Sequence, residues 1–389
     1  RDGKSYPLHD LMNIPAIAAL HRFEIKGQSP EEPEWYIPYL GQQLRGQALL
    51  DQIEIWLSKG IIEPSHANAL RLVHAHPEWL DLSKRHMVLL GAGSEAGPLK
   101  WLAKWKANII ALDLPNPKVW QRIIDIIQQG NATLIAPSLN VIDPQTTPTQ
   151  VIDQLGVNLL TQTPEISQWL AEQPEQLDLA AIAYLDGEKH VRVSMAMDSI
   201  MHYVSQQKSD TSLMYMCTPT DVYAIPAEIM QQTQQQSQQR SQLEKLCSKG
   251  ISILSLKHFF QPQTAQSILA DNHKFYAIAD CIVVEQGPNY ALAKRLQQWR
   301  ATLARHQGQQ VSINIAPSTT THSVTKNPIL KAAFEGASLF GVEAFEPDTT
   351  NAIMAALWIQ DLYNPKALSN PKNSLEHPLQ LIMDGANHG

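Results

Sequence analysis

Cysteine is scarce in this chain of 389 residues. The three cysteines, Cys217, Cys247 and Cys281, lie far apart and form no C-x-x-C pair, which argues against a disulfide framework and against a cysteine-rich zinc site. The histidines are scattered, and none belongs to an H-E-x-x-H motif. We therefore expect a protein of the reducing cytoplasm that holds no metal.

Charged residues are also few, at 17% against about 25% in typical domains. Acidic residues number 37 and basic ones 30, which gives a net charge of −7. Nucleic acids and anionic membranes require a basic surface, so we expect no nucleic-acid partner. No apolar run reaches the ~18 residues that span a bilayer, and no signal-peptide core is visible, so we expect no membrane insertion.

Hydrophobic residues make up 44% of the chain, enough to bury a sizeable core. From residue 85 onward, short apolar runs alternate with amphipathic stretches of helical length. The runs that predict strands are 86–90, 108–112, 132–136, 179–184 and 212–217. This alternation is typical of βαβ units, and it predicts an α/β fold with a doubly wound parallel sheet of the Rossmann-like kind.

Two segments depart from this rhythm. Residues 1–84 carry helical patterning without strand-like runs, and they predict a helical N-terminal extension to a Rossmann-like domain at 85–389. The glutamine-rich tract at 231–239 predicts a solvated helix, and 251–256 predicts an extra strand. Together these features indicate an insertion at about 221–275.

A glycine-rich turn follows the first predicted strand, and a helix predicted to continue to about Ala107 follows the turn. The turn contains Gly91, Gly93, Ser94 and Gly97, and Asp113 ends the second strand. Glycines let backbone N–H groups approach a pyrophosphate, and a carboxylate at this position accepts hydrogen bonds from an adenosine ribose while repelling a 2′-phosphate. The pattern predicts dinucleotide binding, with NAD favoured over NADP. S-adenosylmethionine methyltransferases share this arrangement and remain an alternative.

A second candidate site lies on the helix predicted from residue 290 to about 306. Tyr290 and Lys294 are four residues apart, so they share one helix face. A lysine ammonium beside a phenol favours the phenolate, which suits the tyrosine to exchange a proton near neutral pH. Leu292, Trp299 and Leu303 form an apolar stripe on another face.

The order of these elements resembles the short-chain dehydrogenase/reductase superfamily. After the Tyr290–Lys294 helix, a predicted strand runs into Ala316-Pro317 and Thr319, and the run 379–383 precedes Asp384-Gly385. The resemblance covers about 85–220 and 276–389. It implies an NAD(P)-dependent oxidoreductase acting on a small carbonyl or alcohol substrate.

The resemblance also implies roles for these residues. Tyr290 and Lys294 would be catalytic, and Pro317 and Thr319 would lie at the cofactor together with the glycine turn and Lys294. A homodimer or tetramer would form through the helix that begins at Tyr290.

Two of the chain's departures from the family bear most on its chemistry. Glu95 replaces the middle glycine of the turn, and the family's catalytic serine has no counterpart near Ala277, about a dozen residues before the tyrosine. Thr218 or Thr220, at the end of the fifth strand, could supply that hydroxyl, and Thr218 is our third catalytic candidate. A non-catalytic nucleotide-binding or scaffold protein on the same fold therefore stays open, with a methyltransferase as the third hypothesis.

Further polar residues could reach the carboxyl edge of the sheet, where such folds bind ligands, or they could belong to a capped and solvated helix end. They are His190, Arg192 and Asp198 at the start of a predicted helix, and Asp221 and Tyr223 beside the same edge.

Overall fold

The computed structural model of the chain describes residues 5–143, 145–239, 268–270, 273–283, 286–340 and 342–376. The chain divides into two units. The larger comprises Arg1–Thr218 and Gly287–Asn373, and the smaller comprises Pro219–Gln286 and Ser374–Gly389. The predicted strands at 251–256 and 379–383, with Asp384 and Gly385, lie outside the described residues.

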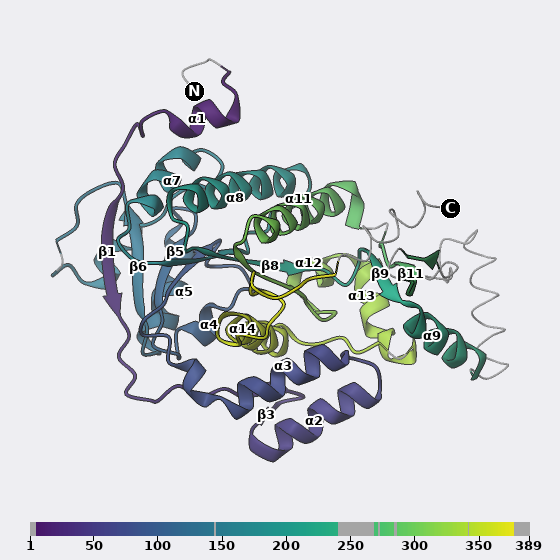
Figure 1. Cartoon of the computed structure of the whole chain (residues 1–389). Coiled ribbons are helices and arrows are strands. Elements are labelled where there is room, and N and C mark those ends of the chain that lie inside the picture. The colour runs from purple at the N-terminus through teal and green to yellow at the C-terminus, as the bar shows by residue number, and fades with distance from the viewer. Residues whose placement is uncertain are drawn as a thin grey trace. The chain divides into compact units, whose positions relative to one another are not determined.

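A seven-stranded sheet forms the centre of the larger unit (Figure 1). In sheet order its strands are β1 (His21–Lys26), β6 (Thr133–Ser138), β5 (Asn108–Leu112), β4 (His86–Leu90), β7 (Leu177–Ala181), β8 (Ser212–Cys217) and β12 (Gln310–Ile315). Only β1 is antiparallel to its neighbour. Numbered along the chain, the six parallel strands lie in the order 3-2-1-4-5-6, which is the Rossmann order. The predicted doubly wound α/β fold is confirmed.

The parallel strands are buried on both faces because side chains alternate across the sheet. Met87 and Leu89 of β4 enter one core, while Val88 and Leu90 enter the other. All four side chains are fully buried. A strand covered on both faces reads as a continuous apolar run, which is why these strands could be found from the sequence.

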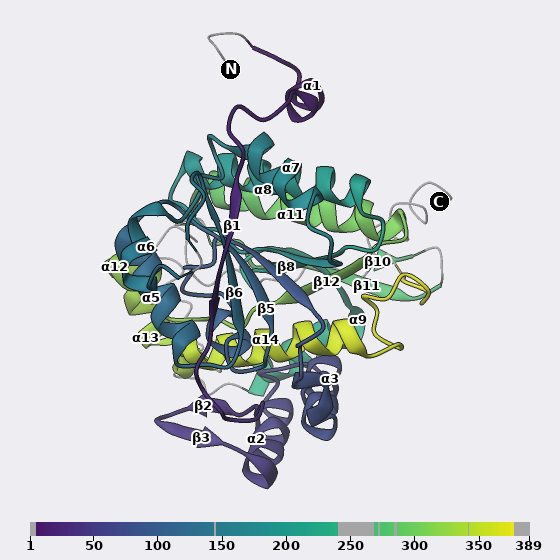
Figure 2. The same cartoon turned by 90° about the vertical axis from the view of Figure 1, so that its left-hand side faces the viewer.

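Helices cover both faces of this sheet (Figures 1 and 2). One face carries α7 (Thr163–Ala171), α8 (Glu188–Gln207) and α11 (Gly287–His306), and the other carries α4 (Leu99–Leu102), α5 (Pro117–Gln128) and α14 (Pro347–Tyr363). Outside α14 lie α2 (Gly46–Ser58) and α3 (Pro64–Ala75). No helix within the described residues is long and apolar enough to cross a membrane.

The smaller elements of the larger unit connect or extend these layers. They are α1 (Leu8–Asn13), the hairpin of β2 (Ile37–Tyr39) and β3 (Gln42–Leu44), α6 (Pro148–Val151), α12 (His322–Lys326), α13 (Pro328–Glu335) and the 3-10 turns Pro77–Leu80, Ile152–Gln154 and Ala337–Phe340.

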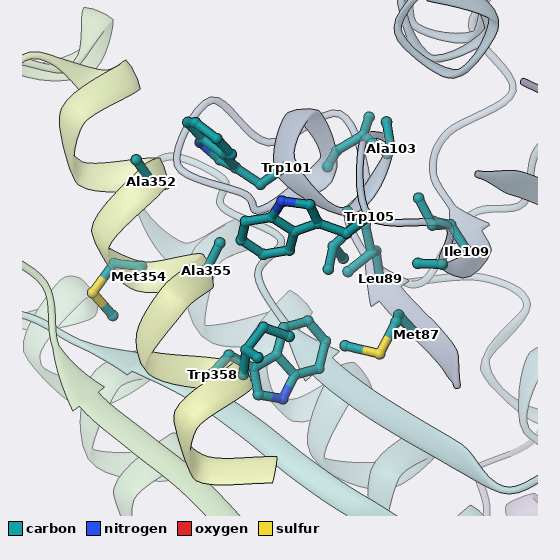
Figure 3. Close-up of a cluster of buried hydrophobic side chains, with 14 of the residues drawn as sticks. Met87, Leu89, Trp101, Ala103, Trp105, Ile109, Ala352, Met354, Ala355 and Trp358 are labelled. Carbon is teal, nitrogen blue, oxygen red and sulfur yellow. The ribbon is translucent and has the colours of Figure 1, made fainter. Parts of the chain in front are cut away.

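Helix α14 is buried on all sides, and its residues from Ala352 to Ile359 are accordingly apolar. Every residue from Thr349 to Asp361 is buried between the sheet and its neighbouring helices. Figure 3 shows Trp358 and Ala355 of this helix facing Trp105 and the β4 residues Met87 and Leu89. Large aromatic groups contribute much of the buried area of such a core.

The prediction that residues 1–84 form a purely helical extension is wrong. Helices α2 and α3 are present, but the segment also holds three strands, and β1 forms an edge of the central sheet. In β1, Phe23 and Ile25 are buried while Arg22 and Glu24 are exposed. This alternation is only six residues long and half polar, as befits an edge strand, and it does not stand out in the sequence.

The helix after the glycine turn is also shorter than expected. It was predicted to continue to about Ala107, whereas α4 ends at Leu102 and irregular turns follow. Lys106 has a φ of +56°, a left-handed conformation that an α-helix does not contain.

The smaller unit contains a three-stranded antiparallel sheet of β9 (Val222–Pro226), β11 (Phe275–Asp280) and the short β10 (Ile268–Leu269). Helix α9 (Ala227–Gln239) includes the glutamine-rich tract, so the helix predicted there is confirmed. The predicted insertion at 221–275 falls within this unit. Ala277, near which the family's serine is missing, lies in β11.

A buried carboxyl group joins α14 to β12 and makes stability depend on pH. The Asp361 carboxylate accepts hydrogen bonds from Ser312 Oγ and Asn314 Nδ2, both at 2.7 Å. Burial raises the pKa of Asp361 to about 6, although these hydrogen bonds oppose the shift. The folded state therefore holds this proton more tightly than the unfolded chain does.

We predict that this group's contribution to stability is present below about pH 4 and is lost as the pH rises through about 6. A shift of about two pKa units corresponds to about 3 kcal/mol. Asp361→Asn keeps the shape and an acceptor but cannot ionise. Between about pH 4 and 7 the free energy of unfolding of the natural chain, measured in urea, should fall by about 3 kcal/mol more than that of the variant. Parallel pH profiles would contradict this.

Candidate functional site

The loop after β4 lies against the ends of β5 and β7. Gly91 has a φ of +96°, and a Cβ atom added there would lie 2.5 Å from Ala183 Cα. Its N–H donates to Leu112 O at 2.8 Å. Only glycine fits this position, because both the φ and the close approach exclude a side chain. The loop is thereby held at the point where the chain order of the sheet reverses, between β4 and β7.

Asp113 is bound to the glycine loop. Its carboxylate accepts from the N–H of Gly93 at 2.7 Å and from that of Leu114 at 2.8 Å. Burial raises the pKa of Asp113, while these two N–H groups and the charge of Arg122 oppose the shift. An ionised carboxylate has about four acceptor positions, so Asp113 can accept further hydrogen bonds.

Arg122, on the second turn of α5, was not identified from the sequence. Its guanidinium donates to the carbonyl oxygen of Gly93, and it acts on the charge of Asp113. A guanidinium presents several donors in one plane and suits phosphate recognition. Its spacing from Asp113, nine residues across a turn, carries no recognisable signal in the sequence.

Most N–H groups of the glycine loop are already used within the protein. Ser94 N donates to Gly91 O, and Gly97 N donates to Ser94 O. Among the described residues, the N–H groups of Glu95 and Ala96 have no hydrogen-bond partner. The Glu95 carboxylate accepts from His322 N at 3.1 Å, so this acid is held by the chain that follows β12.

Tyr290 and Lys294 lie at the carboxyl ends of β7 and β8. Lys294 Nζ donates to Met216 O, near the end of β8, at 3.0 Å and lies 5.8 Å from the centroid of the Tyr290 ring. The Tyr290 ring is 6.4 Å from that of Tyr184, which follows Ala183 in the chain. The predicted pair therefore shares one edge of the sheet with the glycine loop.

His190, at the start of α8, packs against both of these tyrosine rings, and we call Tyr184, His190 and Tyr290 the Tyr290 cluster. The His190 ring stacks on that of Tyr290, with centroids 5.7 Å apart and planes at 23°, and it lies 4.6 Å from the Tyr184 ring. Burial, and then the charge of Lys294, lower the pKa of His190 to about 4. The ring is consequently neutral at pH 7.

The other predicted polar residues have separate roles. Arg192 is exposed and pairs with Glu188, and Asp198 pairs with Arg300 at 2.5 Å. Asp221 and Tyr223 lie in the smaller unit.

The remaining predicted site residues lie at the ends of β8 and β12. Thr218 is buried directly after β8. Beyond β12, the Thr319 hydroxyl donates to Pro317 O and shares a hydrogen bond with Thr350, both at 2.7 Å. The hydroxyl of Thr319 is therefore committed to shaping its loop.

The described residues contain no group of three or more histidine, cysteine, aspartate or glutamate side chains that could hold a metal ion. No family model matches the chain. The curated proteins contain no match either. Among solved structures, the chain is similar to the terminal R domain from the myxalamid PKS-NRPS biosynthetic pathway, at 12% identity and a TM-score of 0.36, over 77% of this chain and 67% of that one.

Proposed function

We propose that the chain is an NAD(P)-dependent oxidoreductase acting on a carbonyl or alcohol substrate. The observation that supports this most directly is the Tyr290–Lys294 pair at the carboxyl ends of β7 and β8. The close approach of Gly91 to Ala183 holds the glycine loop beside Tyr184, whose ring adjoins those of His190 and Tyr290. A nucleotide-binding type of loop and a Tyr-Lys pair thus meet at the topological switch point of a Rossmann sheet.

The donors and acceptors at this edge fit a dinucleotide. Asp113 has acceptor capacity for the hydroxyls of the adenosine ribose, and the N–H groups of Glu95 and Ala96 can bind the pyrophosphate. Two of the three N–H groups of Lys294 have no partner among the described residues, and they can bind the second ribose. When bound, the nicotinamide supplies or accepts the hydride.

The chain's own residues handle the proton. Tyr290 donates its hydroxyl proton to the substrate oxygen in the direction of reduction, and it takes the proton back in the direction of oxidation. The positive charge of Lys294 stabilises the phenolate that forms in between. The carbonyl of Met216 fixes Lys294 at the end of β8 and so keeps this charge near the ring.

Cofactor choice is set by two opposed charges, Asp113 and Arg122. We expect NADH to bind more tightly than NADPH, because the Asp113 carboxylate repels a 2′-phosphate. Asp113→Asn should shift the ratio of the two dissociation constants towards NADPH, and Arg122→Ala should shift it towards NADH. Each change should be about tenfold, the effect of one charge-assisted hydrogen bond. Fluorescence titration with both dinucleotides measures the ratio.

S-adenosylmethionine serves as the third ligand in this titration, since it distinguishes the methyltransferase hypothesis. Equal or tighter binding of NADPH by the natural chain would refute the assignment of Asp113. Binding of S-adenosylmethionine without either dinucleotide would refute the proposed function.

Tyr290→Phe tests the proton transfer directly. The variant keeps the ring that stacks on His190 but loses the transferable proton, so turnover should fall about 10²–10⁴-fold while dinucleotide binding changes only a few-fold. A panel of carbonyl compounds first identifies an activity. Thr218→Val and Thr220→Val then test the missing hydroxyl, and a loss in one of them alone would identify the substitute for serine. Unchanged turnover in Tyr290→Phe would rule out this mechanism.

A second candidate function is nucleotide binding without catalysis. It is favoured by the position of Ala277, because the segment where the family's serine would lie forms a strand of the smaller unit. Tight dinucleotide binding, with no turnover of the carbonyl panel that depends on Tyr290, would support this alternative.

We also propose that a second copy of the chain covers α11. This helix buries its small residues, including Ala293 and Ala301, and exposes Leu292, Trp299 and Leu303 by 44%, 56% and 50%. Large apolar side chains grouped on one helix face favour association. Light scattering at micromolar concentration should give a dimer, and Trp299→Glu should give a monomer. A monomeric natural chain would refute the assignment.

A further inference from the structure

His190 is the most deeply buried polar side chain of the Tyr290 cluster. It is 2% exposed, and neither of its ring nitrogens has a hydrogen-bond partner among the described residues. A buried polar group without a partner costs roughly 1–3 kcal/mol. Packing alone would favour an apolar ring at this position. The imidazole therefore indicates a ligand that forms a hydrogen bond with one of its nitrogens.

The surroundings of His190 show where such a ligand would sit. Tyr290 stacks on one side of the imidazole, and the charge of Lys294 acts on it. Tyr184 covers the ring from a half-exposed position, 45% accessible to solvent. The segment after Tyr184 runs to Gly187, where an added Cβ would have no atom within 4 Å. The Tyr184 ring adjoins both other rings, so a ligand that takes its place or packs beside it would reach His190 and Tyr290 together.

We propose that His190 donates an N–H hydrogen bond to the same substrate oxygen that Tyr290 protonates. The inference rests on the proposed function and deepens it, since it assigns the second donor that the missing serine leaves open. Because burial keeps the imidazole neutral at pH 7, one ring nitrogen carries a proton and the other does not. His190 thus contributes a hydrogen bond and keeps its proton.

The bonds and charges balance in the direction of reduction. A reduced dinucleotide would supply the hydride for the new C–H bond, and the π electron pair of the carbonyl would move to its oxygen. The Tyr290 O–H bond breaks, and its proton joins that oxygen to give the alcohol. The His190 N–H polarises the carbonyl and stabilises the developing negative charge, as a donor of an oxyanion hole does. Lys294 stabilises the Tyr290 phenolate until solvent returns the proton.

The first test compares three variants by turnover. His190→Phe keeps a flat ring between Tyr184 and Tyr290 but removes both nitrogens, and it should lower kcat about 10²-fold, as the loss of one oxyanion-hole donor does. His190→Gln retains an N–H donor and should recover part of this loss. The matched control is His66→Phe on α3, because His66 also has a buried nitrogen without a partner in the described parts of the chain and a pKa lowered by burial to about 4. It should leave kcat unchanged.

The second test needs no turnover. The oxidised dinucleotide and a ketone form a complex that cannot react, because neither the oxidised ring nor the ketone carbon carries a transferable hydride. The imidazole ¹⁵N–H resonance of His190, assigned by its loss in His190→Gln, should move downfield when the ketone is added. The resonance of His66 should stay in place.

The outcomes separate this inference from the proposed function. Failure of both dinucleotides to bind overturns both. Suppose that a dinucleotide binds and that turnover depends on Tyr290. An unchanged kcat in His190→Phe, or a His190 resonance that does not shift when the ketone is added, would then overturn the role of His190 alone. A lower kcat in His190→Phe that His190→Gln does not improve would show a packing role and would also overturn it.

Discussion

The candidate site depends on the approach of one backbone to another, at Gly91 and Ala183. Parallel strands end at the same edge of a sheet, but the loops that follow them meet only where no side chain intervenes. Gly91, directly after β4, allows this contact, and its N–H also donates a hydrogen bond to the carbonyl of Leu112 at the end of β5. The residue after Ala183 is Tyr184, so the same contact sets the distance between the glycine loop and the aromatic cluster.

The two faces of the sheet serve different purposes around this edge. The face with α14 is filled by tryptophan, methionine and alanine side chains and gives a rigid base for the glycine loop (Figure 3). Asn351 on α14 donates to Glu95 O, which ties the loop to that base. The opposite face brings α8 and α11 together, and each contributes one residue, His190 and Tyr290, to the cluster. A stiff support beneath such groups limits their movement, as precise proton transfer requires.

The sequence predicted the parts of the fold whose local pattern is strong. Strands β4, β5 and β8 have the predicted bounds because continuous apolar runs mark strands buried on both faces. Strand β1 was missed because pairing with β6, more than one hundred residues away, stabilises a short and half-polar segment. The extent of α4 was misjudged because the turns after Leu102 follow from tertiary packing, which local propensity does not contain.

The glycine loop is weaker evidence for a ligand than its sequence suggests. Gly91 is required by the contact with the Ala183 backbone, whereas a Cβ at Gly93 would meet only side-chain atoms, the nearest being Val119 Cγ1 at 2.8 Å. A folded chain would need Gly91 with or without a dinucleotide. His190 differs, because the fold gains nothing from two buried nitrogens that have no hydrogen-bond partner within the part of the chain that the structure describes. Function is therefore better inferred from polar groups that packing disfavours than from glycines that packing demands.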